Sequence, residues 1–363
     1  MLHNMPIKLF LFISAMVLFV SCTGVNPQST DALPNSLNSS QQTANGTSAA
    51  APTAVAAATS TPPPTAIPTE TSTLVPTTTA TPTSVPAATA AKPMTREKDG
   101  MVMVNVPGGP FIMGSDIAEV NEKPSHTVTL PGFWIDQTEV TNAMFGKFVK
   151  ATNYLTEAEK PLWSYEFNLN TKEQGGIPGA DWRHPRGPKS SVSGLSTHPV
   201  VHVSWNDSAA YCEWVGARLP SEAEWEKSAR GVDGRTYPWG EAAPDGKLLN
   251  YADVNLDVDW ADKSVDDGNE FTAPVGSYPT GVSPYGAYDM AGNVWEWVAD
   301  WYADSYYQDS PSDNPTGPTA GDGRTLRGGS WNNEADFVRT SNRVWYAPVG
   351  PYGNLGFRCA KSN

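Results

Sequence analysis

A tryptophan-rich stretch at residues 286–301, GAYDMAGNVWEWVADW, constrains the fold of this chain more than any other feature. Its tryptophans, Trp295, Trp297 and Trp301, carry so much apolar area that they predict a core. Their spacing fits neither a regular helix nor a regular strand, and the glycines and asparagine before them indicate tight turns. The stretch therefore predicts an aromatic core crossed by turns whose backbone carbonyls point inward.

Oxygen-bearing groups recur through the same stretch. Asp289, Gly292, Val294 and Glu296 offer carboxylates and free carbonyls at short spacing, which suits a hard cation such as calcium. Composition alone supports a second interpretation equally well. In that interpretation the stretch is a tryptophan-rich core hairpin with solvated acids, because Asp and Glu are ordinarily exposed.

Six further motifs follow one another between about residue 100 and the C-terminus. They are VNVPGGPFIMG at 104–114, EVTN at 139–142, PVVHVSW at 199–205, ARLPSEAEWE at 217–226, RTLRGGSW at 324–331 and NLGFRCA at 354–360. With the tryptophan-rich stretch, they closely resemble the formylglycine-generating enzyme (sulfatase-modifying factor) family. The resemblance implies an α+β formylglycine-generating-enzyme domain, an elaborated C-type-lectin-like fold with little regular secondary structure.

The N-terminus has the character of an export signal. Residues 1–22 resemble a lipoprotein signal peptide, with Lys8, an apolar run at 9–20, and Ser21 directly before Cys22. The run is shorter than the roughly 20 residues of a membrane-spanning helix. We therefore expect lipidation at Cys22 and a location in the cell envelope, anchored to the membrane through lipid only and facing outside the cytoplasm. An uncleaved anchor is the alternative.

Two segments of different composition follow the signal. Residues 23–93 consist mainly of Thr, Ala, Pro and Ser, which predicts a disordered stalk because such a segment buries too little apolar surface to offset its ordering entropy. Residues 94–363 hold all thirteen tryptophans and are expected to form one sulfatase-modifying-factor domain. The net charge of −14 lies in this domain, and it argues against a nucleic-acid partner, whose phosphates require clustered Lys and Arg.

Local signals predict few regular elements in the domain. Polar residues before amphipathic patterns predict helix N-termini at Thr141, Ser204 and Ser221. The segment 153–198 is rich in Gly and Pro and predicts a long loop that lines a site. Short strands are predicted at 101–106 and 127–130, and turns with short strands are predicted beyond Gly231.

The resemblance implies two structural calcium sites. The ligands would be Asn250, Asp267 and the carbonyls of Tyr251 and Asn269 in the first site, and Asp289, Glu296 and the carbonyls of Gly292 and Val294 in the second. Asn269 stands where the family usually has an aromatic residue, but a carbonyl does not depend on the side chain. Carboxylates and amide oxygens are suitable calcium ligands, and solvated loop acids are the alternative.

The histidines do not predict a transition-metal site. His198 and His202 are four residues apart, and the apolar alternation at 200–203 indicates a strand. On a strand, residues four apart are separated by about 13 Å, too far for a shared ion.

The resemblance also places a ligand groove beside Ser330, Trp331, Asn333 and Asn354. The family's oxidase binds copper(I) through two cysteines five residues apart, and the matching positions here are Asn333 and Val338. Copper(I) prefers soft thiolates, which an amide and an isopropyl group cannot replace, so we do not expect copper. Family members pair the cysteines that match Cys212 and Cys359, so we expect this disulfide, which an exported location permits.

These expectations converge on an exported lipoprotein. The domain is expected to be a non-oxidase member of the family that binds an exported protein, a peptide or a glycan in its lectin-like groove. The alternative function is that of a formylglycine-generating oxidase, which converts a sulfatase-type cysteine to formylglycine.

Overall fold

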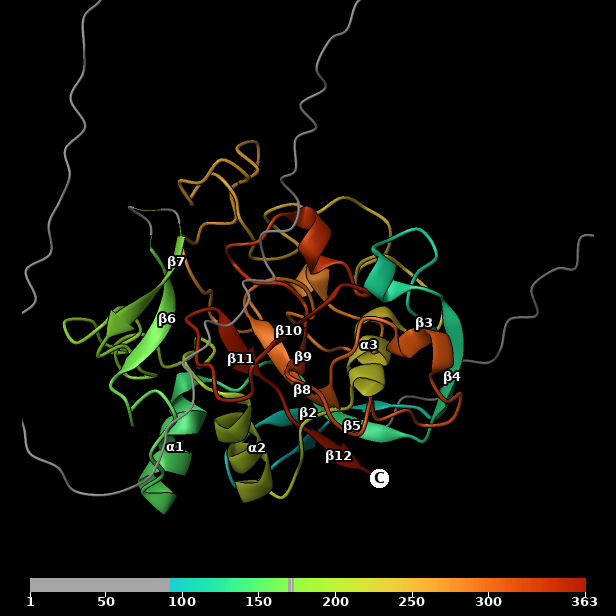
Figure 1. Ribbon diagram of the computed structural model, residues 1–363, viewed down its shortest axis with the longest axis horizontal. Coiled ribbons are helices and arrows are strands. Elements are labelled where there is room, and N and C mark those ends of the chain that lie inside the picture. Colours follow the sequence, from blue (N-terminus) through green and yellow to red (C-terminus); the bar gives the residue numbers. More distant parts are fainter. Residues whose placement is uncertain (1–91, 169–170, 172) are drawn as a thin grey trace, which may run out of the picture. The chain divides into compact units, whose positions relative to one another are not determined.

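The computed structural model describes residues 92–168, 171 and 173–363 (Figure 1). The expected signal peptide, Cys22 and nearly all of the expected stalk lie outside these residues. In the described part of the chain, no helix is both long enough and apolar enough to cross a membrane.

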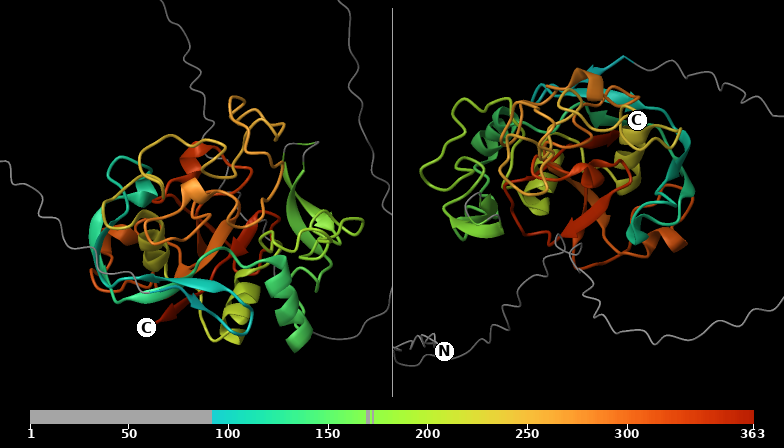
Figure 2. Two further views of the ribbon diagram at one scale, coloured as in Figure 1. Left: turned by 180° about the vertical axis from the view of Figure 1, so that it is seen from behind. Right: turned by 90° about the horizontal axis from the view of Figure 1, so that it is seen from above.

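The first sheet joins the beginning and the end of the domain. Its four antiparallel strands lie in the order β1 (Met94–Thr95), β2 (Val102–Val106), β5 (Phe133–Asp136) and β12 (Ala360–Ser362). The predicted strand at 101–106 is therefore confirmed. In the left view of Figure 2, the C-terminal end of the chain, directly after β12, lies at the lower edge of the domain.

The second sheet contains the tryptophan-rich stretch. Its order is β10 (Arg343–Tyr346), β9 (Arg324–Arg327), β8 (Trp295–Trp301) and β11 (Leu355–Phe357), with β11 parallel to β8. The tryptophan spacing fitted no regular element, and the structure shows turns before Trp295 followed by an irregular strand. A central strand covered on both faces need not alternate apolar and polar residues, and the register against β9 also shifts between Trp297 and Trp301. The predicted core is confirmed, because Trp295 and Trp297 are fully buried.

Two separate hairpins complete the strands. β3 (Gly109–Met113) pairs with β4 (His126–Leu130), which confirms the predicted strand at 127–130. β6 (Trp163–Asn168) pairs with β7 (Glu173–Pro178) inside the segment that was predicted to be a loop. The sequence of β7, EQGGIP, has low strand propensity. Contacts with a distant segment support the hairpin, since Tyr165 of β6 stacks on Tyr352 with 4.7 Å between ring centroids.

The three predicted helices are present: α1 (Asn142–Thr152), α2 (Trp205–Trp214) and α3 (Glu222–Arg230). The Thr141 side chain accepts from the backbone N–H of Met144, and Ser204 and Ser221 both form complete capping boxes. Among residues 92–168, 171 and 173–363, the other helical pieces are a single turn, α4 (Tyr306–Asp309), and the 3-10 turns η1 (Val120–Glu122), η2 (Pro279–Gly281) and η3 (Ala335–Val338).

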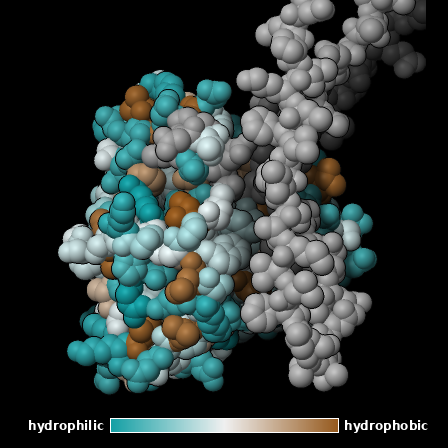
Figure 3. Space-filling model, turned by 60° about the vertical axis from the view of Figure 1, so that its left-hand side comes forward, coloured by the Kyte–Doolittle hydropathy of each residue, from teal (hydrophilic) through white to brown (hydrophobic). Residues whose placement is uncertain are grey.

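The predicted disulfide is confirmed. Cys212 on α2 and Cys359 beside β12 are joined, with an S–S distance of 2.01 Å, and both cysteines are fully buried. The bond links the middle of the domain to its C-terminal strand. Figure 3 shows that the face on the α1 and β6–β7 side is mainly hydrophilic, with small separate apolar patches, so this view shows no extended apolar surface.

Candidate functional site

The chain after β9 forms a compact amide and hydroxyl network around Ser330. The Ser330 hydroxyl lies 2.6 Å from Oδ1 of Asn333 and 2.8 Å from Oδ1 of Asn332, and can donate to either. The Asn354 amide donates to Ser330 Oγ at 3.3 Å and to Asn332 Oδ1 at 3.1 Å. The structure therefore brings together three predicted groove residues and adds Asn332, which no sequence motif had indicated.

Most of this network lies below the surface. Ser330, Trp331 and Asn354 are buried, and Asn333 is half-buried. Val338 is fully buried and packs with Leu249, Tyr251 and Ala291. The two positions that the resemblance matches to the oxidase's cysteines, Asn333 and Val338, therefore present an amide bound to Ser330 and an apolar side chain in a core cluster.

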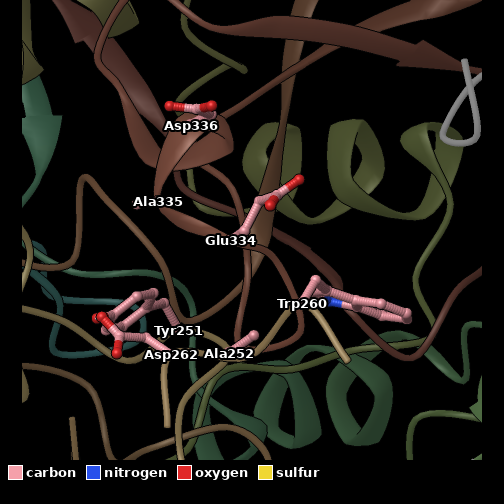
Figure 4. Close-up of a pocket in the computed structure, with 7 residues that line it drawn as sticks. All are labelled: Tyr251, Ala252, Trp260, Asp262, Glu334, Ala335 and Asp336. Atoms are coloured by element: carbon pink, nitrogen blue, oxygen red, sulfur yellow. The ribbon is translucent and has the colours of Figure 1, made fainter. Parts of the chain in front are cut away.

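An open pocket of about 240 Å³ adjoins the network (Figure 4). Its lining comes from two segments that are distant in sequence: Tyr251, Ala252, Trp260, Asp262, Glu334, Ala335 and Asp336. The indole N–H of Trp260 donates to the Asn332 carbonyl at 3.0 Å, and the Ala252 N–H donates to the Asn333 carbonyl at 2.9 Å. These bonds fix the pocket wall to the Ser330 network.

The pocket combines aromatic and acidic groups. Trp260 is 40% exposed, and its ring meets Phe167 edge-on with 5.8 Å between centroids. Burial and the nearby charge of Asp336 raise the pKa of Glu334 above its ordinary value. Figure 4 shows Asp262 next to Tyr251, whose hydroxyl donates to it at 3.1 Å, and Glu334 on another wall. The pocket therefore offers an aromatic face and hydrogen-bond acceptors.

The residues of the first expected calcium site lie on one neighbouring loop. The Asn250 amide nitrogen donates to the carbonyl of Phe271 and to Oδ1 of Asn293, and Oδ1 of Asn250 is buried without a partner. Asp267 accepts from the backbone N–H groups of Tyr251 and Asn269 at 3.0 and 2.8 Å. Burial raises the pKa of Asp267 to about 7.

The second expected site contains a carboxylate that sequence reasoning missed. Asp289 and Glu296 are buried, which excludes the interpretation of solvated acids. Glu139, just before α1, is also fully buried, and its Oε2 has no partner. Burial and the charge of Asp289 raise the pKa of Glu139 well above its ordinary value. Arg358 pairs with both oxygens of Glu296 at 2.6 Å.

The two expected sites are joined through one amide. Asn293 accepts from the Asn250 side chain at 3.0 Å and donates to Oε1 of Glu139 at 2.9 Å. The same residue has a positive φ of 61°, which asparagine tolerates better than most residues. Asn293 lies in the tryptophan-rich motif but was not predicted to take part in either site.

His198 and His202 do not form a joint site. The His198 ring contacts the Thr272 hydroxyl at 3.1 Å, while His202 is buried against other segments. The predicted strand at 200–203 was wrong, because His202 has a φ of 58°, a left-handed conformation that strands do not contain.

Comparison with known proteins identifies the same family that the sequence motifs indicated. The family described as "Sulfatase-modifying factor enzyme 1-like domain" matches residues 88–363. The chain belongs to the sulfatase-modifying factor family. It is 42% identical over 306 residues to a formylglycine-generating enzyme of Streptomyces coelicolor, covering 76% of this chain and 94% of that protein. It is also 39% identical over 287 residues to inactive C-alpha-formylglycine-generating enzyme 2 of Mus musculus, covering 72% and 85%.

A solved structure supports the fold of this sulfatase-modifying factor domain. PvdO from Pseudomonas aeruginosa aligns with a TM-score of 0.60 and 29% identity, covering 76% of this chain and all of that one. The elaborated lectin-like α+β fold is therefore shown. The similar proteins include some named formylglycine-generating enzyme and some named inactive, so membership alone does not assign an activity.

Both expected calcium sites of this family member retain buried oxygen atoms that a calcium ion could take as ligands, although Arg358 and Trp225 already bind the oxygens of Glu296. Unpartnered buried oxygens remain on Asn250 and Glu139, and buried carboxylates of the second place exceed their single cation, Arg358. Across the residues that the structure describes, no group of three or more His, Cys, Asp or Glu side chains could hold an ion. A bound calcium ion would therefore need amide and carbonyl oxygens as ligands in addition to carboxylates, which is usual for this ion.

We expect calcium to stabilise the protein. At one hundred times the dissociation constant, calcium should raise the free energy of unfolding by about 2.7 kcal/mol, because it binds only the folded state. Asp289→Asn should remove much of this effect, whereas Asp259→Asn, at an exposed position, should retain it. Thermal unfolding with calcium or EDTA measures the difference, and a melting temperature that EDTA leaves unchanged would contradict the prediction.

Proposed function

We propose that this protein is a non-oxidase member of the sulfatase-modifying factor family that binds a peptide or glycan beside Ser330. One observation carries the proposal: Asn333 and Val338 occupy the positions that match the copper-binding cysteines of the family's oxidase. The Asn333 amide oxygen accepts from the backbone and hydroxyl of Ser330, and Val338 is fully buried. Neither position offers a thiolate, the soft ligand that copper(I) requires.

No other cysteine is available to replace this pair. The chain has three cysteines, and Cys212 and Cys359 are consumed by the disulfide. Cys22, which we propose carries the lipid anchor, is distant in sequence and lies outside the described residues. The proposal therefore includes the absence of copper.

The chemistry of the site supports a binding function. An exposed indole next to carboxylate and amide oxygens can stack on a sugar ring or a proline and can accept hydrogen bonds from hydroxyl or amide groups. The pocket at Trp260 and the half-buried Asn333 provide these groups at the surface. The buried disulfide favours an exported location, and with the expected signal we propose a lipid-anchored protein of the cell envelope whose ligand is itself exported.

The formylglycine-generating oxidase remains the alternative function. The 42% identity to an enzyme of that name favours it. Oxidation would then have to proceed without the cysteine pair.

We expect the purified protein to bind no copper(I) under anaerobic conditions and to leave a Cys-x-Pro-x-Arg peptide unoxidised with copper and oxygen present. The double variant Asn333→Cys, Val338→Cys should gain copper(I) binding, while Asn333→Cys alone should bind it much more weakly. Titration of copper(I) and mass spectrometry of the peptide measure both results. Formylglycine formed by the unmodified protein would overturn the proposal.

Binding is tested in the same preparation. Calorimetry with the same peptide, and an array of glycans, should give a ligand whose affinity falls in Trp260→Ala. Trp260 is 40% exposed, and thermal unfolding of this variant checks that the domain still folds without the contacts of the indole with Phe167 and the Asn332 carbonyl. Binding that is equal in the variant and the parent protein would remove the pocket from the proposal.

A further inference from the structure

The pocket beside Trp260 has an acidic lining that no basic residue balances (Figure 4). Asp262 lines one side of it, while Glu334 and Asp336 belong to the turn η3 and the residue before that turn. In the part of the chain that the structure describes, no Lys or Arg lines the pocket or forms an ion pair with these three carboxylates. The pocket therefore carries negative charge that the protein does not compensate.

The basic side chains of the neighbouring segments are bound to other groups. Arg339, which follows η3, binds both carboxylate oxygens of Glu122 at 2.7 and 2.9 Å. Lys263 is next to Asp262 in sequence, and its ammonium donates to the Leu256 carbonyl at 2.6 Å. Neither side chain can turn toward the pocket without losing a hydrogen bond.

The ionisation of the acidic residues reflects this imbalance. Burial and the charge of Asp336 raise the pKa of Glu334 above its ordinary value. Hydrogen bonds from the side chain and the backbone of Ser264 lower the pKa of Asp262, so this carboxylate is ionised at neutral pH. A cation placed among these groups would relieve their mutual repulsion.

Trp260 adds a feature that is independent of the charges. Its indole N–H donates to the Asn332 carbonyl at 3.0 Å, and its ring meets Phe167 edge-on with 5.8 Å between centroids. These contacts fix the orientation of a ring that is still 40% exposed. The face of an aromatic ring attracts cations, and its apolar surface can also bind the alkyl stem of a long side chain.

We infer that this pocket binds a primary ammonium group, and that the ligand is a peptide segment whose lysine side chain enters it. The inference rests on the proposed function and adds the chemistry of the ligand. The lysine stem would lie along Trp260, with its ammonium at the carboxylates of Asp262 and Glu334. The pocket volume of about 240 Å³ is smaller than the roughly 300 Å³ at which small-molecule pockets usually begin, so it suits a single side chain.

The arrangement of the carboxylates favours lysine over other ligand groups. Figure 4 shows Asp262 and Glu334 on separate sides of the pocket. The three donors of an ammonium point in different directions, whereas those of an arginine guanidinium lie in one plane. An acidic peptide or an acidic sugar would meet charge of its own sign, and a neutral sugar would gain nothing from the uncompensated charge.

Titration of the full-length protein with four short peptides tests the inference. Each is an acetylated and amidated Gly-Gly-X-Gly-Gly peptide, in which X is lysine, norleucine, arginine or glutamate. We expect the lysine peptide to bind about tenfold more tightly than the norleucine peptide, which has a similar stem without the charge. The arginine peptide should bind less tightly than the lysine peptide, and the glutamate peptide should not bind. The magnetic resonance signal of the Trp260 indole N–H, assigned from Trp260→Phe, locates the binding.

Variants of the pocket separate the charge from the shape. Glu334→Gln and Asp336→Asn should each reduce the ratio of lysine to norleucine affinity about threefold, and the double variant should bring it close to one. Glu97→Gln removes the same charge at an exposed position outside the pocket lining and should leave the ratio unchanged. Raising the salt from about 10 to about 100 mM shortens the Debye length from about 30 to about 10 Å and should weaken binding of the lysine peptide alone. Thermal unfolding checks that every variant folds.

The outcomes distinguish this inference from the proposed function. Equal affinities for the lysine and norleucine peptides, or a ratio that the pocket variants leave unchanged, would overturn the inference. Glucosamine, a sugar with the same ammonium group, is titrated alongside, and tighter binding of it at Trp260 would also overturn the inference. An uncharged glycan that binds through Trp260 would overturn the inference and leave the proposed function standing. Formylglycine formed by the unmodified protein would overturn the proposed function without changing the preference for lysine.

Discussion

Replacing Cys212 and Cys359 with alanine is expected to lower the free energy of unfolding by about 5 kcal/mol. The bond spans 147 residues, and in the chain-entropy model its loss frees a loop of that length in the unfolded chain. Because both cysteines are fully buried, the loss of packing adds to the effect. A loss of about 5 kcal/mol is a large part of the free energy of unfolding of an ordinary domain.

Urea denaturation of the variant and of the parent protein, oxidised and reduced, measures this prediction. Reduction of the parent should produce nearly the same loss as the double variant, and the denaturant slope should rise because the unfolded chain becomes more expanded. A control in a buried but uncrosslinked position, Ala229→Gly, should lower stability without changing the slope. If the variant and the parent unfold at the same urea concentration, the disulfide does not stabilise the fold.

Local rules account for the parts of the fold that the sequence predicted. Thr141, Ser204 and Ser221 cap helices through their own side chains, and the bonds they make span only three residues. A cap of this kind depends on its immediate neighbours, so it can be read without knowing the rest of the fold. The disulfide was correct for another reason, since it came from the resemblance and not from the spacing of the cysteines.

The parts that the sequence predicted wrongly or left unassigned lie where distant segments decide the conformation. The strand β8 is central in its sheet, so contacts on both faces replace the alternation that a sequence pattern needs. The hairpin of β6 and β7 contacts Tyr352, and His202 owes its left-handed backbone to contacts with β6 and the loop at 351–354. None of these partners is near in sequence.

The candidate site likewise contains residues that could be predicted from the sequence and residues that could not. Its motif residues Ser330 and Asn354 could be predicted, but Asn332, Glu139 and the pocket around Trp260 could not. Glu139 lay in a recognised motif, and the signal that could have found it was a charged residue two positions before a predicted helix cap. Its burial against Asp289 becomes visible only when the chain is folded.

Arg327→Met is expected to lower the free energy of unfolding by about 3 to 5 kcal/mol, the usual cost of breaking a buried ion pair by removing one partner. Arg327 lies on β9 with no exposed surface, and it is paired with Glu226, which is also fully buried. Its guanidinium donates to the carbonyls of Thr340, Ser341 and Asn342. Without these bonds, buried carbonyl oxygens would be left without donors.

Because of these bonds, replacing Arg327 should lower the free energy of unfolding more than replacing an ordinary surface arginine would. Arg324, also on β9, is half-buried between the rings of Trp205 and Trp301 and donates to a single carbonyl, that of Ala299. Arg324→Met is therefore the matched control and should cost about 1 kcal/mol. Arg327→Lys should fall between the two, since an ammonium keeps the charge but cannot match the planar fork.

The same variant tests whether stability and the candidate site are coupled. The carbonyls that Arg327 binds belong to the segment that follows η3, so this side chain holds the end of the loop that begins at Ser330. Hydrogen exchange should therefore show faster exchange at 332–342 in Arg327→Met and normal exchange there in Arg324→Met. Equal protection in both variants would mean that the ion pair stabilises the core without positioning the site. Faster exchange confined to the loop would show that the buried Arg327 side chain both stabilises the core and positions the candidate site. The loop has few regular hydrogen bonds of its own, so its order depends on this side chain.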